Sequence, residues 1–388
     1  MRFLIFDETI SGHHLEYVHH LYDMAVGDSA NDYIFLLPTQ FEEAKKCLQW
    51  KPAVNIKFEL FDDKLLRPSK GGLLGVLQRS KKRCSLVREY VLRYKTDKVF
   101  SNNIMIFVPF GALLLPKNTS LVGIIYKIYL YDRKNASRLS KLSNYIKYKI
   151  LSISKVYNKV LILNDERSAN ELNHMFKSQK FAALVDPYNP IADTSTSCFR
   201  EEYGILDDKI LFSHFGGLAK RKGTLEILKS IQLLSAEECD KYAFAFVGKI
   251  DDGIKEEFYK LYSVLKNKTQ IVLIDAFCPY EMLSSLCKAS DALLCPYLET
   301  SCSSGLIGFA SQYHKPVIAP KTGLLGYIVD KFKLGYLMEI STSDELVVGY
   351  KAIWHKEISA PTSYYIEQNS VENFNNTILS FLRVDKNV

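Results

Sequence analysis

The chain has 388 residues, 47% hydrophobic and 24% charged, a globular composition long enough for two domains. It contains no run of 18 or more apolar residues, so no segment is expected to span a membrane. The eight cysteines form no Cys-x-x-Cys pair and no zinc-type pattern with histidine, which favours reduced thiols in the cytoplasm. The net charge of +7 is mild, so its placement along the chain matters more than its size.

Short apolar runs alternate with helix-length segments through the first half of the chain. The first run stops at Asp7 and is too short for a signal peptide, so we predict a strand there. Several runs are apolar throughout, as strands buried on both faces are, and the alternation predicts a parallel, doubly wound α/β sheet. The expected strands are residues 2–6, 33–37, 56–61, 98–101, 121–126, 159–163 and 181–185, with helices at 15–25 and 73–94 among others.

A linker rich in proline and polar residues runs from Asp186 to about Cys198, and the alternation then restarts. We expect strands at 209–213, 243–247, 270–274, 292–295 and 316–319, helices at 224–234, 254–265, 280–288 and 304–313, and a last helix at 371–382. The predicted domains are 1–187 and 188–365, both Rossmann-like, with 366–388 a C-terminal helix packing back toward the first. Such domains bind ligands at the carboxyl ends of their strands, which here would face each other across a cleft.

A basic turn opens the second domain, where Gly216 and Gly217 precede the run Lys220, Arg221 and Lys222. Glycines let a backbone approach a ligand closely, and cations at a helix N-terminus oppose the helix dipole unless an anion offsets them. A phosphate is the natural anion, and a solvated basic loop is the alternative.

A loop rich in hydroxyls follows the strand that ends near Pro296. It contains Ser301, Ser303, Ser304 and Gly305 immediately before an expected helix. Hydroxyls and free backbone N–H groups at a helix start form a phosphate site. Cys295 and Cys302 bracket this loop and are expected to pack as small apolar residues.

These segments resemble known sequences. The run Gly216-x-Leu218-x-x-x-Lys222-Gly223 resembles the phosphate loop of GT-B glycosyltransferases, particularly glycosyltransferase family 4. Residues 275–283, which include Phe277 and Cys278, resemble the segment that holds the nucleotide base. Residues 286–296 resemble the strand leading to the donor-sugar loop, and 316–319 the strand beyond the helix that follows it. The resemblance covers most of residues 210–336.

The resemblance implies a GT-B architecture with an N-terminal acceptor-binding domain and a C-terminal domain for a UDP- or GDP-linked sugar. It implies retention of anomeric configuration and no bound metal, because basic residues and helix dipoles stabilise the leaving diphosphate. The donor-binding residues expected are Gly12, Gly216, Gly217, Lys220, Arg221, Lys222, Phe277, Cys278, Ser301, Ser303, Ser304 and Gly305.

The sequence also departs from the family. Gly217 stands where the family has a diphosphate-binding arginine, which Lys220 or Arg221 would replace. Two glutamates eight positions apart, for the donor sugar and the ribose, correspond to Ser301 and Phe309. Glu299 is the nearby carboxylate that a loop shift would bring into the catalytic site.

Four of the eight histidines follow the first strand: His13, His14, His19 and His20. An imidazole suits deprotonation of an acceptor hydroxyl, and some inverting GT-B families carry a Gly-His turn here, which keeps inversion open. We predict catalysis by His13 or His14, with Glu16 on the acceptor side and His19 and His20 structural. A metal site or a satisfied histidine cluster are the alternatives.

Polar residues also follow two other strands of the first domain: Asn102 and Asn103 after one, Tyr126 after another. All three are candidates for binding acceptor hydroxyls, and loop capping is the alternative.

Residues 127–159 carry nine Lys or Arg and one Asp among Tyr, Leu and Ile. A basic, amphipathic helix of this kind could lie on an anionic membrane surface. Nucleic acid is not expected, because no motif of a nucleic-acid-binding fold occurs. An ordinary core-packed helix with a charged face is the alternative.

Together these features predict a cytoplasmic glycosyltransferase, peripheral on the inner face of the membrane. It would move a sugar from a nucleotide sugar to a glycan or lipid-linked acceptor in cell-surface polysaccharide synthesis. The alternatives are an inactive GT-B scaffold, which the absent glutamates suggest, and a GT-B sugar-nucleotide epimerase.

Overall fold

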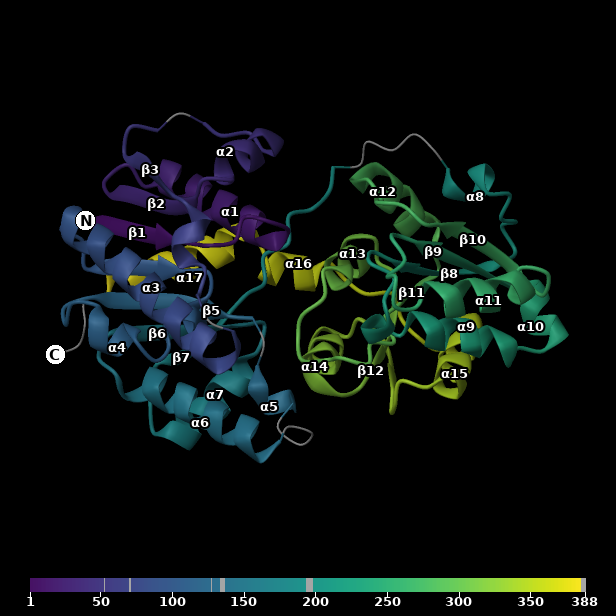
Figure 1. The fold of residues 1–388 in the computed structure, drawn as a ribbon. Helices are drawn as coiled ribbons and strands as arrows, with labels where there is room; N and C mark the ends of the chain where they lie inside the picture. The colour runs from purple at the N-terminus through teal and green to yellow at the C-terminus, as the bar shows by residue number, and fades with distance from the viewer. Residues whose placement is uncertain (52, 70, 127, 133–136, 193–197, 385–388) are drawn as a thin grey trace. The chain divides into compact units, whose positions relative to one another are not determined.

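The computed structural model describes residues 1–51, 53–69, 71–126, 128–132, 137–192 and 198–384 (Figure 1). Contacts divide the chain into two compact units: Met1–Asp186 with Val371–Val388, and Pro187–Ser370. The chain thus leaves the first unit once and returns to it for its last helix. Each unit is described by itself.

The N-terminal unit is a seven-stranded parallel sheet with helices on both faces, in the order β3-β2-β1-β4-β5-β6-β7. Its strands are β1 (Arg2–Phe6), β2 (Asp32–Pro38), β3 (Ile56–Phe61), β4 (Lys98–Ser101), β5 (Ser120–Ile125), β6 (Tyr157–Leu163) and β7 (Phe181–Leu184). Its helices are α1 (His13–Gly27), α2 (Phe41–Ala44), α3 (Gly72–Arg93), α4 (Gly111–Leu114), α5 (Tyr129–Asp132), α6 (Arg138–Ile153), α7 (Glu166–Phe176) and α17 (Val371–Arg383), with short 3-10 turns η1 (Lys45–Cys47), η2 (Asp63–Leu66) and η3 (Ile104–Phe107).

The core of this unit lies between the sheet and helices α1 and α17. Phe374, Ile378 and Leu382 of α17 recur every four residues and are fully buried in a cluster with Phe3, Ile5 and Val18, among others. Such spacing places one apolar stripe on the sheet. The last helix of the chain therefore completes the first unit's core.

The order of the first sheet reverses between β1 and β4, which lie side by side and register Phe6 with Ser101. In doubly wound sheets, ligands bind at the carboxyl ends of the strands where this reversal occurs. The residues that follow these two ends are Asp7 and Asn102, so the topology brings positions 95 residues apart to one point.

The C-terminal unit repeats the arrangement with six parallel strands in the order β10-β9-β8-β11-β12-β13. Its strands are β8 (Ile210–Phe215), β9 (Tyr242–Val247), β10 (Gln270–Ile274), β11 (Ala292–Leu294), β12 (Val317–Pro320) and β13 (Gly335–Met338). Its helices are α8 (Phe199–Glu202), α9 (Thr224–Gln232), α10 (Ala236–Lys241), α11 (Lys255–Leu265), α12 (Tyr280–Ala289), α13 (Leu306–Gln312), α14 (Gly323–Phe332), α15 (Ser343–Trp354) and α16 (Tyr364–Gln368), with the 3-10 turn η4 (Lys220–Lys222). The reversal falls between β8 and β11, at the basic turn and the serine-rich loop.

The expected strands form within one or two residues of their predicted ends, as two Rossmann-like doubly wound sheets. The prediction missed β13, which is short and begins at Gly335 with φ +155°. The helix expected over 304–313 is shorter, because it begins at Leu306 and ends at Gln312. Residues 193–197 of the expected linker lie outside the described residues.

Candidate functional site

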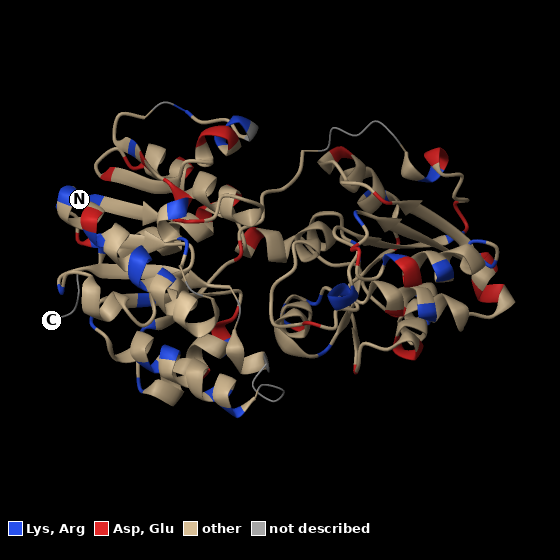
Figure 2. Cartoon of the chain, viewed as in Figure 1, with Lys and Arg blue, Asp and Glu red and all other residues tan. Residues whose placement is uncertain are grey.

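The basic turn leaves β8 through two glycines whose backbones other residues cannot easily adopt. Gly216 has φ +89° and Gly223 has φ +72°. Between them, Lys220, Arg221 and Lys222 form η4, immediately before α9 (blue in Figure 2). Within the described ranges, none of the three cations has an acidic partner within 4 Å. A concentration of positive charge therefore stands uncompensated at a helix start, where the dipole disfavours it.

Lys222 is the most enclosed of the three cations. Its Nζ lies 5.8 Å from the centroid of the Tyr297 ring and would be 3.1 Å from a Cβ at Gly216. Burial lowers the pKa of Lys222, and the adjacent Arg221 adds to the lowering. A bound anion would reverse both effects by restoring the counter-charge that the fold lacks.

The serine-rich loop is joined directly to the basic turn. The N–H of Leu298 donates to the carbonyl of Arg221 at 2.9 Å, and that of Glu299 donates to the same oxygen at 3.3 Å. A Cβ on Gly223 would lie 2.1 Å from the Pro296 carbonyl oxygen. The two segments expected to bind phosphate therefore form one structure at the switch point of the second sheet.

The serines themselves are mostly enclosed. Ser301 and Ser304 are buried, and the hydroxyls of Tyr297 and Ser304 are 3.0 Å apart. Ser303 Oγ is buried and has no hydrogen-bond partner within the part of the chain that the structure describes. Gly305 is exposed and directly precedes α13. An unpartnered buried hydroxyl costs free energy unless a ligand satisfies it.

His214 ties the loops together, and the sequence prediction missed it. Its Nδ1 is 2.9 Å from the carbonyl of Leu294 and its Nε2 is 3.0 Å from Thr224 Oγ1. Burial lowers the pKa of His214 to about 4, so the ring is neutral. The only indication of this role in the sequence was a single histidine within an otherwise apolar strand.

Near the two positions where the family resemblance implies carboxylates, the structure has an exposed glutamate and a packed phenylalanine. The Glu299 side chain is exposed. Phe309, at the second glutamate position, lies edge-on to Phe215 with centroids 5.4 Å apart, and to Tyr188 at 5.7 Å. An aromatic wall thus occupies the place of the second carboxylate.

The two residues expected to bind the nucleotide base differ in their exposure to solvent. Phe277 is 89% exposed, which leaves its ring available for stacking, whereas Cys278 is buried. Asp275 accepts the N–H of Ile250 at 2.9 Å, so it organises the neighbouring loop. Of the two cysteines expected to pack as apolar residues, Cys295 is buried but Cys302 is exposed. The expectation for Cys302 was wrong, because the loop turns it outward.

A polar cluster lies at the switch point of the first sheet. Asp7 is 3% exposed and its Oδ2 is 2.8 Å from His14 Nδ1. Asn102, fully buried after β4, donates from Nδ2 to the same oxygen at 2.8 Å. Gly12 directly precedes α1 with φ +58°, which favours glycine there. Asp7 was not predicted, since a single aspartate after a strand carries no signal of its own.

Aromatic rings surround these side chains. The Tyr126 ring lies 5.1 Å from that of His13 and 5.2 Å from that of His14. Burial, with Asp7 and Asp186 nearby, raises the pKa of Tyr126. Tyr17 donates its hydroxyl to Asp186. Polar side chains from β1, α1, β4 and β5 therefore meet around one aromatic patch.

Other predicted residues of this unit have structural roles. Asn103 accepts the N–H of Met105 and caps η3. His19 Nε2 is 2.7 Å from the Gln49 carbonyl, and His20 packs against Phe374. Glu16 is exposed on the first turn of α1. The histidines thus separate into an inner pair near Asp7 and an outer pair that supports the helix.

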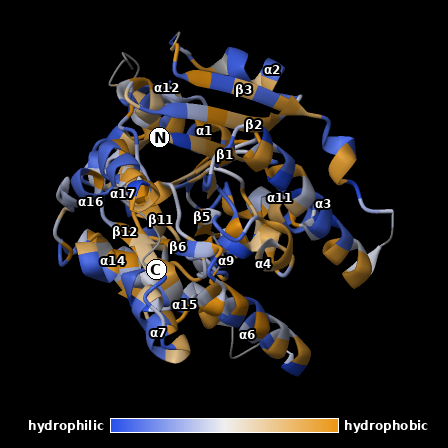
Figure 3. Ribbon diagram, turned by 90° about the vertical axis from the view of Figure 1, so that its left-hand side faces the viewer, coloured by the Kyte–Doolittle hydropathy of each residue, from blue (hydrophilic) through white to orange (hydrophobic). Residues whose placement is uncertain are grey.

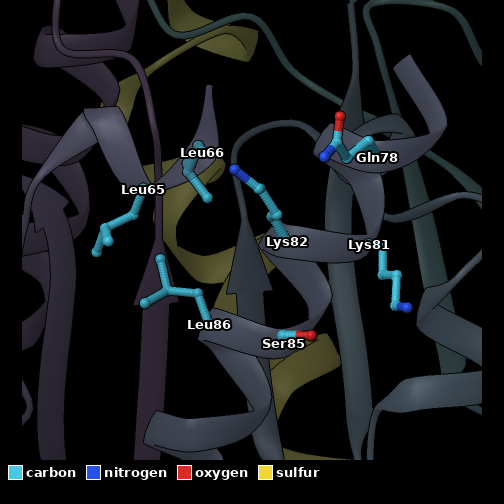
Figure 4. Close-up of a pocket in the computed structure, with 7 residues that line it drawn as sticks. All are labelled: Leu65, Leu66, Gln78, Lys81, Lys82, Ser85 and Leu86. Carbon is cyan, nitrogen blue, oxygen red and sulfur yellow. The ribbon is translucent and has the colours of Figure 1, made fainter. Parts of the chain in front are cut away.

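A pocket of about 390 Å³ lies in the N-terminal unit, between η2 and α3 (Figure 4). Leucines and lysines line it, and Lys82 extends toward Leu66 whereas Lys81 points away. None of the predicted site residues contributes to this pocket. Across the described ranges, no three His, Cys, Asp or Glu side chains lie close enough to hold a metal. No described helix has the length and hydrophobicity needed to cross a bilayer.

Solved structures share this architecture. Anabaena Alr3699/HepE in complex with UDP has a TM-score of 0.66 at 17% identity, covering 98% of each chain. WaaG, a glycosyltransferase involved in lipopolysaccharide biosynthesis, has a TM-score of 0.66 at 15% identity, covering 99% of this chain and 100% of WaaG. A glycosyltransferase from Rickettsia africae ESF-5 has a TM-score of 0.67 at 16% identity, covering 98% of this chain and 97% of its own.

No protein-family model and no curated protein matches the sequence. At identities this low, structural likeness establishes the fold and not the reaction. The two parallel sheets, the switch points and the structural neighbours agree on one architecture. The chain therefore has the GT-B fold of the glycosyltransferases.

Proposed function

We propose that this chain is a glycosyltransferase of the hexosyltransferase type. It takes a sugar from a UDP- or GDP-linked donor and transfers it to a hydroxyl of a glycan or lipid-linked acceptor in cell-surface polysaccharide synthesis. Its neighbours include HepE in complex with UDP-glucose and WaaG, which is involved in lipopolysaccharide biosynthesis. Both support this class of substrate.

The observation that carries the proposal is the joined pair of loops at the ends of β8 and β11. These loops carry three cations and a buried Ser303 hydroxyl, and among the described residues the cations have no acidic partner and the hydroxyl has no hydrogen-bond partner. A diphosphate would neutralise the cations and accept a hydrogen bond from the hydroxyl. As the donor bond breaks, negative charge grows on the leaving diphosphate, and fixed cations stabilise it. No metal is part of the proposal.

Donor binding tests this assignment. Lys222→Ala removes the enclosed cation, whereas Lys260→Ala removes an exposed lysine of α11 in the same unit. A hydrogen bond to a charged group contributes about 1.5–3 kcal/mol, so Lys222→Ala should weaken UDP or GDP binding by roughly 10- to 150-fold. In titration calorimetry, the control variant Lys260→Ala should bind UDP or GDP with the same affinity as the wild type. Equal affinities in the two variants would contradict the proposed diphosphate site.

We assign the acceptor side to the N-terminal unit. The polar cluster at the ends of β1 and β4 offers His13 or His14 as a proton acceptor, with Asn102 and Tyr126 beside them. Glu16 and Asn103 stay in the proposed acceptor set at its edge, although Asn103 already caps η3. Glu299 stays a candidate catalytic carboxylate on the donor side. The family resemblance favours retention, and the anomeric configuration of the product distinguishes it from inversion.

An inactive scaffold is the second candidate, because Phe309 packs against Phe215 where the family has a glutamate. Such a protein would bind nucleotide sugar without turning it over. Release of UDP from UDP-glucose by the wild type, abolished in Lys222→Ala, would exclude this candidate. Conversion of the donor to another nucleotide sugar without any acceptor would instead identify an epimerase.

We further propose that α6 holds the enzyme on an anionic membrane surface, at the cytoplasmic face. Leu139, Leu142, Ile146 and Ile153 are all exposed and recur at helical spacing, roughly opposite the buried Tyr148 and Leu151. Apolar and polar positions alternate along this helix in Figure 3, and Figure 2 shows basic residues on it. No acidic residue occurs in Arg138–Ile153. Lys127 and residues 133–136 of the predicted basic segment lie outside the described residues.

Vesicle flotation tests the membrane proposal. The double variant Leu142→Ser/Ile146→Ser should weaken the free energy of membrane binding by about 2 kcal/mol, because two apolar side chains no longer enter the bilayer. Partitioning into vesicles that contain phosphatidylglycerol should therefore fall roughly thirty-fold. Val264→Ser, at an exposed apolar position of α11, serves as the control and should float as the wild type does. Equal flotation with anionic and purely zwitterionic vesicles would contradict the proposal.

A further inference from the structure

One stretch of the N-terminal unit is strongly basic and contains no acidic residue. Residues 64–88 include eight Lys or Arg and no Asp or Glu. Arg67 is 3.1 Å from the carboxylate of Asp63, and the buried Arg83 pairs with Glu8. No other Lys or Arg of this stretch that the structure describes has a carboxylate within 4 Å. The stretch therefore favours an anionic partner.

The pocket between η2 and α3 lies within this basic stretch (Figure 4). It is lined by the leucines Leu65, Leu66 and Leu86 and by Gln78, Lys81, Lys82 and Ser85. Lys82 extends toward Leu66, whereas Lys81 points away. The volume of about 390 Å³ is within the range of small-ligand sites, about 300–1,000 Å³. The pocket thus offers apolar contact next to a positive charge.

Hydrogen bonds join the loop after η2 to α3. Gln78 Oε1 accepts the N–H of Ser69 at 2.9 Å, and Gln78 Nε2 donates to Ser69 Oγ at 2.9 Å. Lys82 Nζ donates to the carbonyl of Arg67 at 2.6 Å. Among the described residues this is the only bond of the Lys82 ammonium, so two of its three protons remain for a ligand. A pocket held in this way loses little conformational entropy when a ligand binds.

Exposed apolar side chains also lie next to the pocket in the sequence. Leu65, which lines the pocket, is more than half exposed. Leu73, Leu74 and Val76, in the first turns of α3, are each more than half exposed as well. Exposed apolar surface of this kind, surrounded by polar residues, marks sites that bind a membrane, a ligand or a partner. The ligand of this pocket is therefore expected to carry an apolar part as well as a negative charge.

These features indicate which kind of anion fits. A nucleic acid would neutralise the lysines but would leave the leucines in water. A docked protein needs about 20–30 residues on each side, many more than the seven that line this pocket. A lipid phosphate meets both requirements, because its chain covers the leucines while its head group approaches the ammonium.

We propose that the pocket between η2 and α3 binds one anionic lipid. The phosphate lies at Lys82 Nζ, and the first part of the chain lies against Leu65, Leu66 and Leu86. A lysine binds a phosphate as a point charge, so a phosphate monoester and a phosphate diester both fit. The site takes a single molecule, unlike the exposed face of α6, which would lie on many lipids. The inference goes beyond the proposed sugar transfer and does not depend on it.

Titration calorimetry of the full chain with decyl phosphate tests the site, at concentrations below those at which the probe forms micelles. We expect saturable binding of one molecule per chain. Decylphosphocholine has the same chain and no net charge, and it should bind about ten-fold more weakly. Inorganic phosphate has the charge without the chain, and at equal concentration it should not displace decyl phosphate.

Two adjacent lysines supply a matched pair of variants. Lys82→Met keeps an unbranched apolar side chain but removes the charge, so decyl phosphate should bind about ten-fold more weakly and decylphosphocholine as in the wild type. Lys81→Met, at the lysine that points away, should stay within two-fold of the wild type. Leu65→Ser, at an exposed position that tolerates substitution, should weaken the binding of both probes about five-fold.

Two further variants locate the bound probe. Lys222→Ala in the proposed donor loop and Leu142→Ser/Ile146→Ser on α6 should each bind decyl phosphate within two-fold of the wild type. Loss of binding in either variant would place the probe at that other site and overturn the inference. Equal affinity for the two probes, several molecules bound per chain, no saturable binding, or wild-type affinity in both Lys82→Met and Leu65→Ser would also overturn it. None of these results bears on the donor site, which the binding of UDP or GDP tests separately.

Discussion

Gly223 offers a sharp test of how the donor loops are held together. It has φ +72°, and a Cβ there would lie 2.1 Å from the carbonyl oxygen of Pro296 and 2.9 Å from its carbonyl carbon. Both atoms belong to the backbone, so no side-chain rotation can relieve the clash. Gly223→Ala must therefore separate η4 from the loop that follows β11.

The expected cost has two parts. Left-handed backbone costs a non-glycine residue about 1–2 kcal/mol, and forcing extra volume into a packed site costs about 1–3 kcal/mol more. Gly204→Ala isolates the first part, because Gly204 has φ +62° and nothing within 4 Å of its Cβ position. Gly223→Ala should therefore be about 1–3 kcal/mol less stable than Gly204→Ala.

Urea unfolding can measure this difference in the C-terminal unit alone. The chain has two tryptophans, and in a Trp50→Phe background only Trp354 reports, from its edge-on contact with Tyr242 at 5.7 Å. Because the clash moves Lys222 relative to the serine loop, UDP affinity should also fall about ten-fold or more. Stabilities within about 0.5 kcal/mol of each other, together with equal UDP affinities, would refute the reasoning.

Two further predictions concern stability. Arg83 pairs with Glu8, with side chains 10% and 20% exposed; Arg83→Met should cost about 3 kcal/mol by leaving a carboxylate unpaired, and adding Glu8→Gln should recover part of that loss in urea unfolding. Burial lowers the pKa of both His20 and His214 to about 4. As the pH falls, these histidines become protonated in the unfolded chain before they do so in the folded protein. The free energy of unfolding should therefore fall by about 3 kcal/mol for each histidine between pH 6.5 and 4, and should not depend on them above pH 6.5. In urea unfolding at several pH values, His214→Asn should reduce the slope of the free energy of unfolding against pH by the equivalent of about one proton. An unchanged slope would contradict the burial assigned to His214.

The two loops of the candidate donor site could be located from the sequence because the residues of each loop are local, and their binding of phosphate stays a prediction. Gly216 to Gly223 form one turn, and Ser301 to Gly305 form one loop, so their chemistry is visible as motifs. What the sequence did not indicate is the link between them, from the Leu298 N–H to the Arg221 carbonyl. Backbone contacts of this kind depend on no side chain and leave no pattern.

The N-terminal site was predicted only in part. The histidines after β1 stood out by composition, but nothing local separates His14 from His13. Their difference comes from Asp7, whose orientation depends on Asn102 at the end of a strand 95 residues away. The exposed stripe of α6 is a similar case, since its spacing predicts an amphipathic helix but only packing decides which apolar face is covered.

The sequence by itself determined the alternation of strands and helices, the two parallel sheets and the position of the basic turn and the serine-rich loop, because apolar runs and glycine-bounded turns act over short distances. The tertiary structure alone decided which strands are neighbours, and hence that β1 lies beside β4 and β8 beside β11. Side chains meet at those reversals because hydrophobic burial fixes the strand order. The contact between His14 and Asp7, the enclosure of Lys222 and the position of the Ser303 hydroxyl, which has no partner among the described residues, all follow from that order.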